Sequence, residues 1–294
     1  MNVSKYVSKH FPSLRGKKVA VSGATGGIGN QLCRHLAQLG ASLVLLDRNK
    51  KRSRALGKQL KAEFPKLSVS YITLDLEDVK TVRAAAQKLL ADVPDFLILN
   101  AGAYNIPRHV CSTGYDNVFQ INFISPYLLA RTLLPAILQK GGKVVAVSSI
   151  AHNYSHIDEK DVDFRTRQRS SLVYGNAKRY LTYSLISLDG INIVHPGITL
   201  TNITAHYPKV IFALIKHPMK VIFMSPKKAS LCILAGLFST VPSGSTSWIG
   251  PRLKDIWGLP RRAPLNTASQ EERDTICAIA EEIFQNLSEN GENV

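Results

Sequence analysis

Cysteine is scarce in this sequence. The 294 residues include only four, far apart and without a C-x-x-C pair: Cys33, Cys111, Cys232 and Cys277. This argues against a disulfide framework and against a cysteine zinc site, so we expect free thiols and no bound metal. The chain also lacks an apolar run of membrane-spanning length, and residues 1–18 lack the apolar core of a secretory signal. We therefore expect a cytoplasmic protein.

Acidic residues are also few. The chain has 21 Asp and Glu against 37 Lys and Arg, which gives a formal net charge of +16. Residues 1–70 carry a net +12 of this excess, and residues 71–294 carry +4. Attraction of an anionic cofactor, attachment to acidic lipid or nucleic acid, and simple solvation all fit such an excess. Because basic excess alone is weak evidence, we favour a solvated surface and expect no nucleic-acid partner.

No internal repeat or linker divides the chain, and its 45% hydrophobic content supplies one large core over residues 1–294. Strands are expected at 41–46, 67–74, 96–99 and 143–147, and helices at 52–64, 81–90, 115–138 and 173–188. The helix at 115–138 is expected to break at Ser125-Pro126 and at Pro135. This alternation predicts a single α/β domain, a doubly wound parallel sheet of Rossmann type with helices on both faces.

A glycine-rich turn from Ser22 to Gly29 lies between an apolar run and a helical pattern. Backbone N–H groups and the helix dipole at such a helix start favour a phosphate. Gly23 suits the tight turn, Gly27 lets a pyrophosphate approach, and Gly29 lets the helix lie against the strand. Short glycine motifs also occur by chance, so this motif alone leaves a cofactor site and an ordinary turn equally open.

Asp47 ends the second apolar run, 24 positions after Gly23. Dinucleotide folds place an acid at about this distance to bind the adenosine ribose, and an acid there disfavours the 2′-phosphate of NADP. Arg48 and four further basic residues follow at once, and a basic residue after the strand usually holds that phosphate. The position of the acid is fixed, whereas long basic side chains can point to water. We therefore favour NAD and keep NADP as the alternative.

Tyr174 and Lys178 lie four residues apart in a helical pattern, so their side chains share a face. A free tyrosine has a pKa of about 10, and a nearby cation lowers it. Ser149, just after the apolar run 143–147, is placed to hydrogen-bond a substrate oxygen while Tyr174 takes or gives its proton. Asn122 lies inside a helical pattern, where an asparagine is most often a polar surface residue.

These residues form an ordered series: Gly-x-x-x-Gly-x-Gly from Gly23, Asp75-Leu76, Asn100-Ala101-Gly102, Asn122, Ser148-Ser149, Tyr174-x-x-x-Lys178 and His195-Pro196-Gly197. Over about residues 15–202 the series closely resembles the single-domain branch of the short-chain dehydrogenase/reductase family. The resemblance implies a catalytic tetrad. Asn122 would hold a proton-relay water, Ser149 would orient the substrate, Tyr174 would act as acid and base, and Lys178 would also bind the nicotinamide ribose.

The resemblance also implies cofactor contacts. The glycines of the turn would line the pyrophosphate, Asp47 the adenosine ribose, Asp75-Leu76 the adenine and Thr201 the nicotinamide carboxamide, while Asn100 would support the central strand. The full cofactor-binding set expected is Gly23, Thr25, Gly26, Gly27, Ile28, Gly29, Asp47, Arg48, Asp75, Leu76, Asn100, Ala101, Gly102, Tyr174, Lys178, Pro196, Gly197, Thr199 and Thr201.

The loop after Ser149 looks like that of retinol-dehydrogenase-like members, which take bulky apolar alcohols and carbonyls. Ser149 and Tyr174 are 25 positions apart, longer than the commonest spacing in the family. Asp47 departs from that subgroup, so cofactor choice does not carry over from it. His152 and Tyr154 are expected either to border the substrate or to be ordinary loop residues.

A second departure concerns dimerisation. Lys178 and Pro196 are only 18 positions apart, so the helix that usually builds the family's dimer interface is about two turns short. The usual dimer is therefore not expected.

Residues from about 202 to 264 are expected to form a substrate-binding lid and cap. Val210–Met224 is apolar and is broken by Pro218, so we favour a lid over an apolar substrate and keep a membrane-surface patch as the alternative. A buried helix is expected at 226–240 and irregular structure at 243–264. Ser269 and Glu272 resemble a capping box before a terminal helix.

The sequence thus predicts an oxidoreductase that transfers hydride between a nicotinamide dinucleotide and a lipophilic alcohol or carbonyl, with Tyr174 as acid and base. The alternative is a catalytically silent NAD(P)-binding sensor or membrane-surface adaptor.

Overall fold

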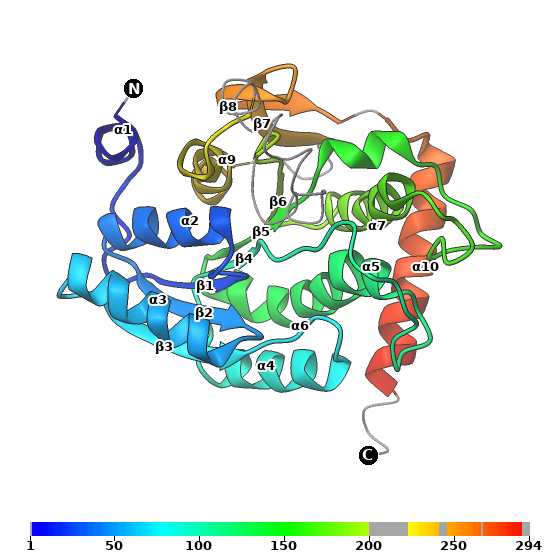
Figure 1. The fold of residues 1–294 in the computed structure, drawn as a ribbon, viewed down its shortest axis with the longest axis horizontal. Helices are drawn as coiled ribbons and strands as arrows, with labels where there is room; N and C mark the ends of the chain where they lie inside the picture. The colour runs from blue at the N-terminus through cyan, green and yellow to red at the C-terminus, as the bar shows by residue number, and fades with distance from the viewer. Residues whose placement is uncertain (1, 200–222, 241–245, 266, 290–294) are drawn as a thin grey trace, which may run out of the picture.

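The computed structural model describes residues 2–199, 223–240, 246–265 and 267–289. The strands are β1 (Lys18–Ser22), β2 (Ser42–Asp47), β3 (Val69–Thr73), β4 (Phe96–Leu99), β5 (Lys143–Val147), β6 (Ile191–Val194), β7 (Ser247–Leu253) and β8 (Trp257–Pro264). They form one sheet in the order β3-β2-β1-β4-β5-β6-β7-β8, parallel up to β7, with β8 antiparallel to it (Figure 1). The doubly wound parallel sheet predicted from the sequence is confirmed.

Helices cover both faces of this sheet. They are α1 (Val3–His10), α2 (Gly27–Gln38), α3 (Lys50–Glu63), α4 (Val79–Ala91), α5 (Asn117–Phe119), the π-helical η1 (Gln120–Ile124), α6 (Ser125–Gln139), the 3₁₀ turn η2 (Ile150–Tyr154), α7 (Ser170–Leu185), α9 (Pro226–Phe238) and α10 (Gln270–Glu289). One apolar core lies between the sheet and α4, α6, α7 and α10, and the other lies between the sheet and α2, α3 and α9 (Figure 1). Because both faces are covered, β1, β4, β5 and β6 are almost continuously apolar.

The carboxyl ends of the central strands bring the polar residues of the sequence motifs to one edge of the sheet. Gly23 follows β1, Asp47 ends β2, Asn100 follows β4 and Ser148 follows β5. Since these strands are parallel neighbours, residues more than a hundred positions apart are brought to the same edge. This edge is where an open α/β sheet binds its ligand.

The helix at 115–138 differs from its prediction. It does not break at Ser125-Pro126 or at Pro135, because α5, η1 and α6 follow one another without a gap. The ring of Pro126 supplies no N–H to the carbonyl of Asn122 four residues earlier, and the Ser125 N–H instead donates to the carbonyl of Gln120 in a π turn. Proline here coincides with a changed local hydrogen-bond register, and the helical segments continue past it.

The expectation of irregular structure at 243–264 is wrong for the described part of that region, which is the hairpin β7–β8. The hairpin accommodates three prolines, because Pro260 and Pro264 lie on the edge strand β8 and Pro251 of β7 lies beside a bulge. Lys254 and Asp255 make the turn with φ of 50° and 55°. The buried helix expected at 226–240 is confirmed as α9.

The ends of the described chain hold two further helices. The sequence analysis missed α1, which packs its buried Val3 and Val7 against α2 and α9. The terminal helix is present as α10, and its Glu272 N–H donates to the Ser269 hydroxyl at 3.1 Å. The second half of the predicted capping box is absent, because the Glu272 carboxylate is instead bound to Arg179.

Candidate active site

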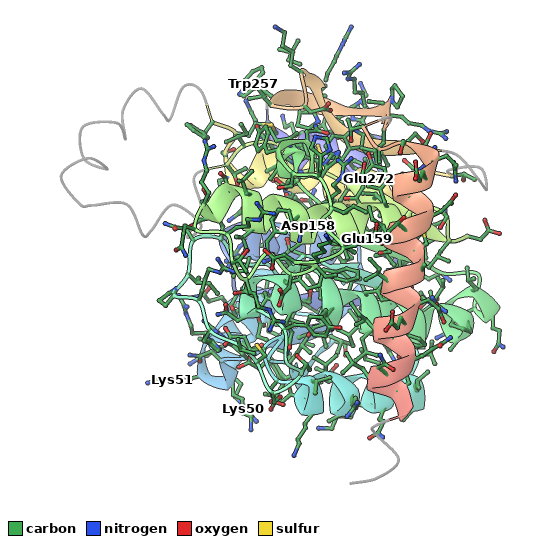
Figure 2. The ribbon with its side chains drawn as sticks, turned by 90° about the vertical axis from the view of Figure 1, so that its right-hand side faces the viewer. Lys50, Lys51, Asp158, Glu159, Trp257 and Glu272 are labelled. Carbon is green, nitrogen blue, oxygen red and sulfur yellow. The ribbon has the colours of Figure 1, made fainter. Side chains whose placement is uncertain are left out.

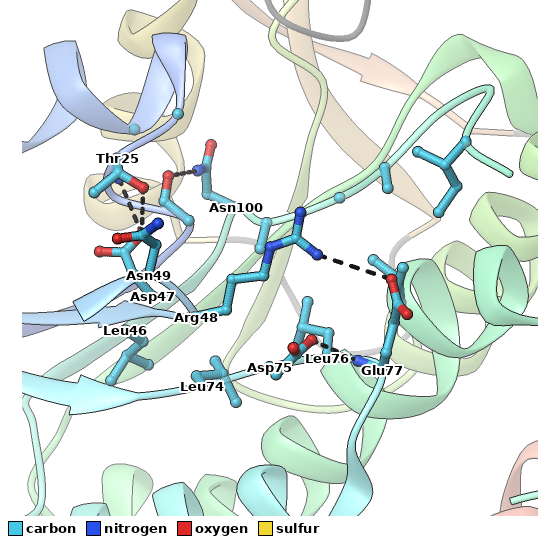
Figure 3. A pocket seen from close by; sticks show the side chains of 18 of the residues that line it. Thr25, Leu46, Asp47, Arg48, Asn49, Leu74, Asp75, Leu76, Glu77 and Asn100 are labelled. Carbon is cyan, nitrogen blue, oxygen red and sulfur yellow. Dashed lines mark hydrogen bonds and ion pairs between the residues drawn. The ribbon is translucent and has the colours of Figure 1, made fainter. Parts of the chain in front are cut away.

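A cavity of about 650 Å³ opens at the carboxyl edge of the sheet, beside the start of α2 (Figure 3). The residues that line it include Gly23, Thr25, Gly26, Gly27, Ile28, Gly29, Asp47, Arg48, Asp75, Leu76, Asn100, Ala101 and Gly102. The structure therefore brings together thirteen of the residues that the sequence predicted for a cofactor site.

The glycine turn is shaped by close backbone contacts. Gly23 has φ of +65°, and a side chain on it would lie 2.9 Å from the Cα of Ala101. A side chain on Gly29 would lie 2.2 Å from the carbonyl oxygen of Gly23, so only glycine allows α2 to start here. Asn100 Nδ2 holds the turn from the neighbouring strand by donating to the carbonyls of Ser22 at 3.0 Å and Gly23 at 3.2 Å. The N-terminus of α2 thus faces the cavity in a fixed position.

Asp47 lies in the cavity wall, 5% exposed, with both carboxylate oxygens engaged. Its Oδ1 accepts from the N–H and the hydroxyl of Thr25 at 3.0 and 2.9 Å, and its Oδ2 accepts from the hydroxyl of Ser53 at 2.9 Å (Figure 3). The carboxylate therefore fastens the glycine turn to α3, a structural role that sequence spacing did not reveal. Each oxygen keeps further acceptor capacity for a ligand hydroxyl.

Arg48 extends across the mouth of the same cavity. Its side chain is 72% exposed and its Nη1 lies 3.9 Å from a carboxylate oxygen of Glu77 (Figure 3). Glu77 also lies 3.3 Å from the Nε2 of His109. The basic residue that follows β2 thus has an acidic partner within the described part of the protein.

A second cavity of about 270 Å³ adjoins the first and shares Ile28, Asn100 and Gly102 with it. Ser149, Tyr174 and Lys178 line it, as do Pro196, Gly197 and Thr199. The rest of its wall is largely apolar or aromatic, with Tyr104, Ile150, Ala151, Tyr154 and Ile198. Three members of the expected tetrad therefore face one small cavity that opens onto the dinucleotide-sized one.

Tyr174 and Lys178 lie on α7 as the four-residue spacing predicts, with Lys178 Nζ 5.7 Å from the centre of the Tyr174 ring. Lys178 is buried and donates to the carbonyl of Val147 at 3.0 Å. Burial raises the pKa of Tyr174 to about 12, against the effect of its side-chain hydrogen bond with Ser149. Burial also lowers the pKa of Lys178 to about 7. The expected lowering of the Tyr174 pKa is thus not seen, because desolvation of its hydroxyl is the largest effect on that pKa.

Asn122 lies in the π turn η1 and is fully buried, so it is not a polar surface residue. Its Nδ2 donates to the carbonyls of Ala103 and Val118, both at 2.8 Å, and its Oδ1 accepts from the Ala103 N–H at 3.2 Å. A side chain on Gly102 would lie 2.8 Å from Asn122 Oδ1 and 3.6 Å from Lys178 Nζ. Asn122 therefore clamps the loop after β4 next to the lysine.

A layer of side chains beneath Ser149 was missed by the sequence analysis. His152 is buried and does not line the cavity, in contrast to Tyr154, so of the two alternatives left open it fits the one that does not border the substrate. Its Nδ1 donates to the carbonyl of Ser149 at 2.6 Å, and its ring packs edge-on against Trp248 at 5.1 Å. His195 stacks on the same indole at 5.3 Å. Burial lowers the pKa of His152 to about 4 and that of His195 to about 3, so both rings are neutral.

Arg179, the neighbour of Lys178, completes this layer. It is 1% exposed and donates to the carbonyls of His152 at 3.0 Å and Thr267 at 2.7 Å, as well as to both oxygens of Glu272. The sequence does contain one signal for this layer: Arg179 falls at a helical position that faces the core. A buried arginine needs a partner, so its position indicates an ion pair.

Some predicted positions lie outside the described residues. Thr201 is one, and Val210–Met224, expected as a lid, is described only at Phe223 and Met224. Met224 is buried and its N–H donates to the carbonyl of Ile198 at 2.9 Å.

The expectation that no segment reaches membrane-spanning length needs correction. By length and composition Asn117–Gln139 would cross a bilayer, but 72% of its most apolar window is buried inside the protein, as in a core helix. Among the described residues, no group of three or more His, Cys, Asp and Glu side chains is arranged to hold a metal ion.

The sheet order, the glycine turn and the two adjoining cavities define a Rossmann-type nucleotide-binding protein. Residues 17–159 match the family model described as short chain dehydrogenase. Over this region, just under half of its length, the chain resembles the short-chain dehydrogenase/reductase family and, within it, retinol-dehydrogenase-like members.

Two relatives illustrate this resemblance. Human retinol dehydrogenase 13 is 29% identical over 206 residues, which cover 66% of this chain and 62% of the relative. Mouse retinol dehydrogenase 12 is 32% identical over 200 residues, which cover 64% of this chain and 63% of the relative. The matched region thus spans less than two thirds of either relative.

Solved structures show the same fold. A putative uncharacterized protein from Mycobacterium paratuberculosis superposes with a TM-score of 0.71 at 23% identity, covering 96% of this chain and 97% of that one. A short-chain dehydrogenase from Sphingobium yanoikuyae, solved in complex with NADPH, superposes with a TM-score of 0.58 at 25% identity, covering 75% and 83% of the two chains.

Proposed function

We propose that this protein is an NAD-linked oxidoreductase that transfers hydride between the nicotinamide and a bulky, apolar alcohol or carbonyl compound. The observation that carries the proposal is the convergence of Ser149, Tyr174 and Lys178 on a small cavity that adjoins a dinucleotide-sized one. The glycine cradle, which any side chain at Gly23 or Gly29 would fill, fits the pyrophosphate of such a cofactor. When bound, the dinucleotide supplies or accepts the hydride.

The residues in and beside the smaller cavity bind the substrate, transfer the proton and position the cofactor. Ser149 orients the substrate oxygen, and Tyr174 donates its proton in carbonyl reduction or removes one in alcohol oxidation. The raised pKa of Tyr174 keeps the hydroxyl protonated, which suits the donor role at neutral pH. Lys178 binds the nicotinamide ribose and, when protonated, stabilises the phenolate left after donation. Asn122 holds a relay water and fixes the loop after β4.

The preference for NAD rests on charge in the larger cavity. Asp47 is an almost buried carboxylate where the adenosine ribose would lie, and a 2′-phosphate beside it would meet charge repulsion. Of the two arginines that line this cavity, Arg48 and Arg52, the first lies close to Glu77. Separate titrations of NADH and NADPH, followed by cofactor fluorescence, test this preference. Tighter binding of NADPH to the wild-type protein would refute it.

An apolar substrate is favoured by the wall of the smaller cavity. Ile150, Ala151 and Ile198 supply aliphatic surface, and Tyr104 packs edge-on against Tyr174 at 5.3 Å between ring centres. A bulky lipophilic alcohol or ketone buries its chain there and leaves one oxygen for Ser149 and Tyr174. The segment 210–224 remains our candidate for a lid.

We also propose that the protein does not form the usual family dimer and acts in the cytoplasm. The outer face of α7 is covered in cis by α10, whose Ile276 and Ile283 are buried in the core shared with α7. That face is therefore occupied by the chain itself. Sedimentation velocity tests the dimer, and fractionation of cells tests the location.

A screen of lipophilic alcohols and ketones, read by the absorbance of reduced nicotinamide, separates this function from the alternative of a silent dinucleotide sensor. We expect turnover with the wild-type protein and loss of it in Ser149→Ala, with cofactor binding retained. Cofactor binding without turnover of any substrate in the screen would favour the sensor.

A further inference from the structure

The hairpin β7–β8 forms one end of the sheet and carries an unusual concentration of exposed apolar side chains. In the described part of the chain, eight large hydrophobic residues are exposed, and three of them fall within residues 253–259. They are Leu253 at 57%, Trp257 at 40% and Leu259 at 38% exposure. Leu253 and Trp257 are paired across the two strands, so they lie side by side. Figure 2 shows Trp257 at the outer end of the molecule, remote from Lys50 and Lys51 of α3.

Basic side chains surround this apolar group. Arg252, Lys254 and Arg261 are exposed on the hairpin, and Lys228 of α9 lies with its Nζ 4.9 Å from the centre of the Trp257 ring. The only acid of the hairpin is Asp255, and burial raises the pKa of its carboxyl. The surface made by Leu253, Trp257, Leu259 and these cations, which we call the hairpin surface, is therefore both apolar and positively charged.

We propose that the hairpin surface docks on an anionic phospholipid bilayer. An exposed indole and leucines gain free energy by entering the boundary between headgroups and acyl chains. Lysine and arginine beside them are attracted to acidic headgroups while their alkyl stems remain in the apolar region. The positive charge of the hairpin surface complements the acidic headgroups, and the cations lie beside the apolar side chains that insert.

The strand edge is less suited to pairing with a second copy of the chain. β8 is the last strand of the sheet, but Pro260 and Pro264 remove two of its N–H donors. The exposed apolar side chains lie at the turn end of the hairpin, where Leu253 and Trp257 form its last pair. A bilayer needs no backbone hydrogen bonds from its partner, so it matches this surface better than another strand does.

The hairpin surface lies next to the smaller cavity. The carbonyl of Ile256, in the turn, accepts the N–H of Ile198 at 3.4 Å, and Ile198 lines that cavity. A side chain on Gly197 would lie 2.8 Å from the same carbonyl. Docking through the hairpin would thus bring the cavity close to the lipid phase from which an apolar substrate would come. This consequence rests on the proposed function, whereas the docking itself does not.

Vesicle co-sedimentation of the full chain, without cofactor or substrate, tests the docking. We expect binding to vesicles of phosphatidylcholine mixed with phosphatidylglycerol, weaker binding to phosphatidylcholine alone, and reversal by salt. Trp257 supplies a second readout, since the only other tryptophan, Trp248, is buried. Binding should shift the emission to shorter wavelength and allow quenching by brominated lipid, and the quenching should disappear in Trp257→Phe.

Two pairs of variants separate this surface from general effects. Arg252→Glu with Lys254→Glu should weaken binding by about fivefold or more per residue. The matched change Lys50→Glu with Lys51→Glu, at the far end of the molecule, should weaken it much less. Leu253→Ser with Leu259→Ser should likewise reduce binding. The control Leu90→Ser with Leu138→Ser, which removes two exposed leucines from α4 and α6, should not. Thermal melting confirms that each variant is folded.

Three outcomes would overturn the proposal: no binding to anionic vesicles, equal loss in the test and control variants, or bound protein whose Trp257 is not quenched. A dimer that dissociates in Leu253→Ser with Leu259→Ser, seen by sedimentation in the absence of lipid, would assign the surface to a second copy. Because turnover is not measured, these results stand apart from those that test the oxidoreductase activity.

Discussion

Arg179 and Glu272 form a doubly hydrogen-bonded ion pair, with Nε and Nη2 of the arginine each 2.6 Å from a carboxylate oxygen. The pair joins α7, which carries Tyr174 and Lys178, to the terminal helix α10. The same guanidinium also binds the carbonyl of His152, whose ring holds the backbone of Ser149. A contact between residues 93 positions apart thus supports the loop that carries the substrate-orienting serine.

Breaking this pair should destabilise the protein strongly. Glu272→Gln leaves a buried guanidinium without its counter-charge, and we expect a loss of about 3 to 5 kcal/mol in the free energy of unfolding, measured by denaturant titration. Arg131 and Glu281 provide the control, because they join the same helix to α6 but are 26% and 39% exposed. Glu281→Gln should cost about 1 kcal/mol or less. Equal losses would show that Arg179 is held no more tightly than a surface residue.

Lys178 should reduce stability at neutral pH. Burial lowers its pKa in the folded protein to about 7 from the usual value of 10.5, so the unfolded chain binds a proton between these values and the folded chain does not. Stability therefore rises with pH from about 7 to 10.5. Below pH 7 the cost of burying the charged group is at its full value and no longer changes with pH. At pH 7 we expect the free energy of unfolding of Lys178→Met to exceed that of the wild type by about 1 to 2 kcal/mol. The variant should lose activity. The gain should shrink toward pH 10; a constant gain would contradict the shifted pKa.

The two buried histidines should make the protein sensitive to acid. Their pKa values lie below the usual 6.5, at about 4 for His152 and about 3 for His195. The contribution of the two neutral rings to the free energy of unfolding is fully present above about pH 6.5. It is lost as pH drops toward 4 and below, because the unfolded chain takes up protons that the folded chain does not. Thermal melts between pH 7 and 4 measure this slope. His195→Phe, which keeps a ring against Trp248, should flatten it, and an unchanged slope would assign acid sensitivity to other groups.

The glycine turn should respond to added methyl groups in proportion to the contacts they make. In Gly29→Ala the new carbon would meet the Gly23 carbonyl at 2.2 Å, whereas in Gly26→Ala the nearest atom is 3.2 Å away. Gly29→Ala should therefore weaken dinucleotide binding much more than Gly26→Ala, by about tenfold or more, since the backbone itself must move. Fluorescence titration of reduced nicotinamide measures both. A larger effect at Gly26 would contradict the arrangement of this turn.

The sequence predicted the sheet and most of the cavity wall because those features are local. Gly23, Asp47 and Asn100 each follow an apolar run, and the parallel order of strands brings such positions together without further information. The spacing of Tyr174 and Lys178 likewise placed both on one helix face.

The remaining features depend on partners distant in the sequence. Arg179 is buried because it pairs with Glu272, and both carboxylate oxygens of Asp47 accept hydrogen bonds, from Thr25 and Ser53. The spacing of residues in the sequence reveals none of these contacts. The hairpin β7–β8 was predicted to be irregular structure. Its prolines fit a strand only at a sheet edge or a bulge, and strand order is not visible in the sequence. The effect of burial on Tyr174 also needs the fold, since it depends on what excludes water from the hydroxyl.

The central claim is that Tyr174 exchanges the proton that accompanies hydride transfer. Tyr174→Phe removes one oxygen and retains the ring that packs against Tyr104. With a lipophilic alcohol or ketone turned over by the wild-type protein, we expect kcat to fall by about 10² to 10⁴ while the dissociation constant for the dinucleotide stays within about threefold. Turnover by Tyr174→Phe at the wild-type rate would contradict the account.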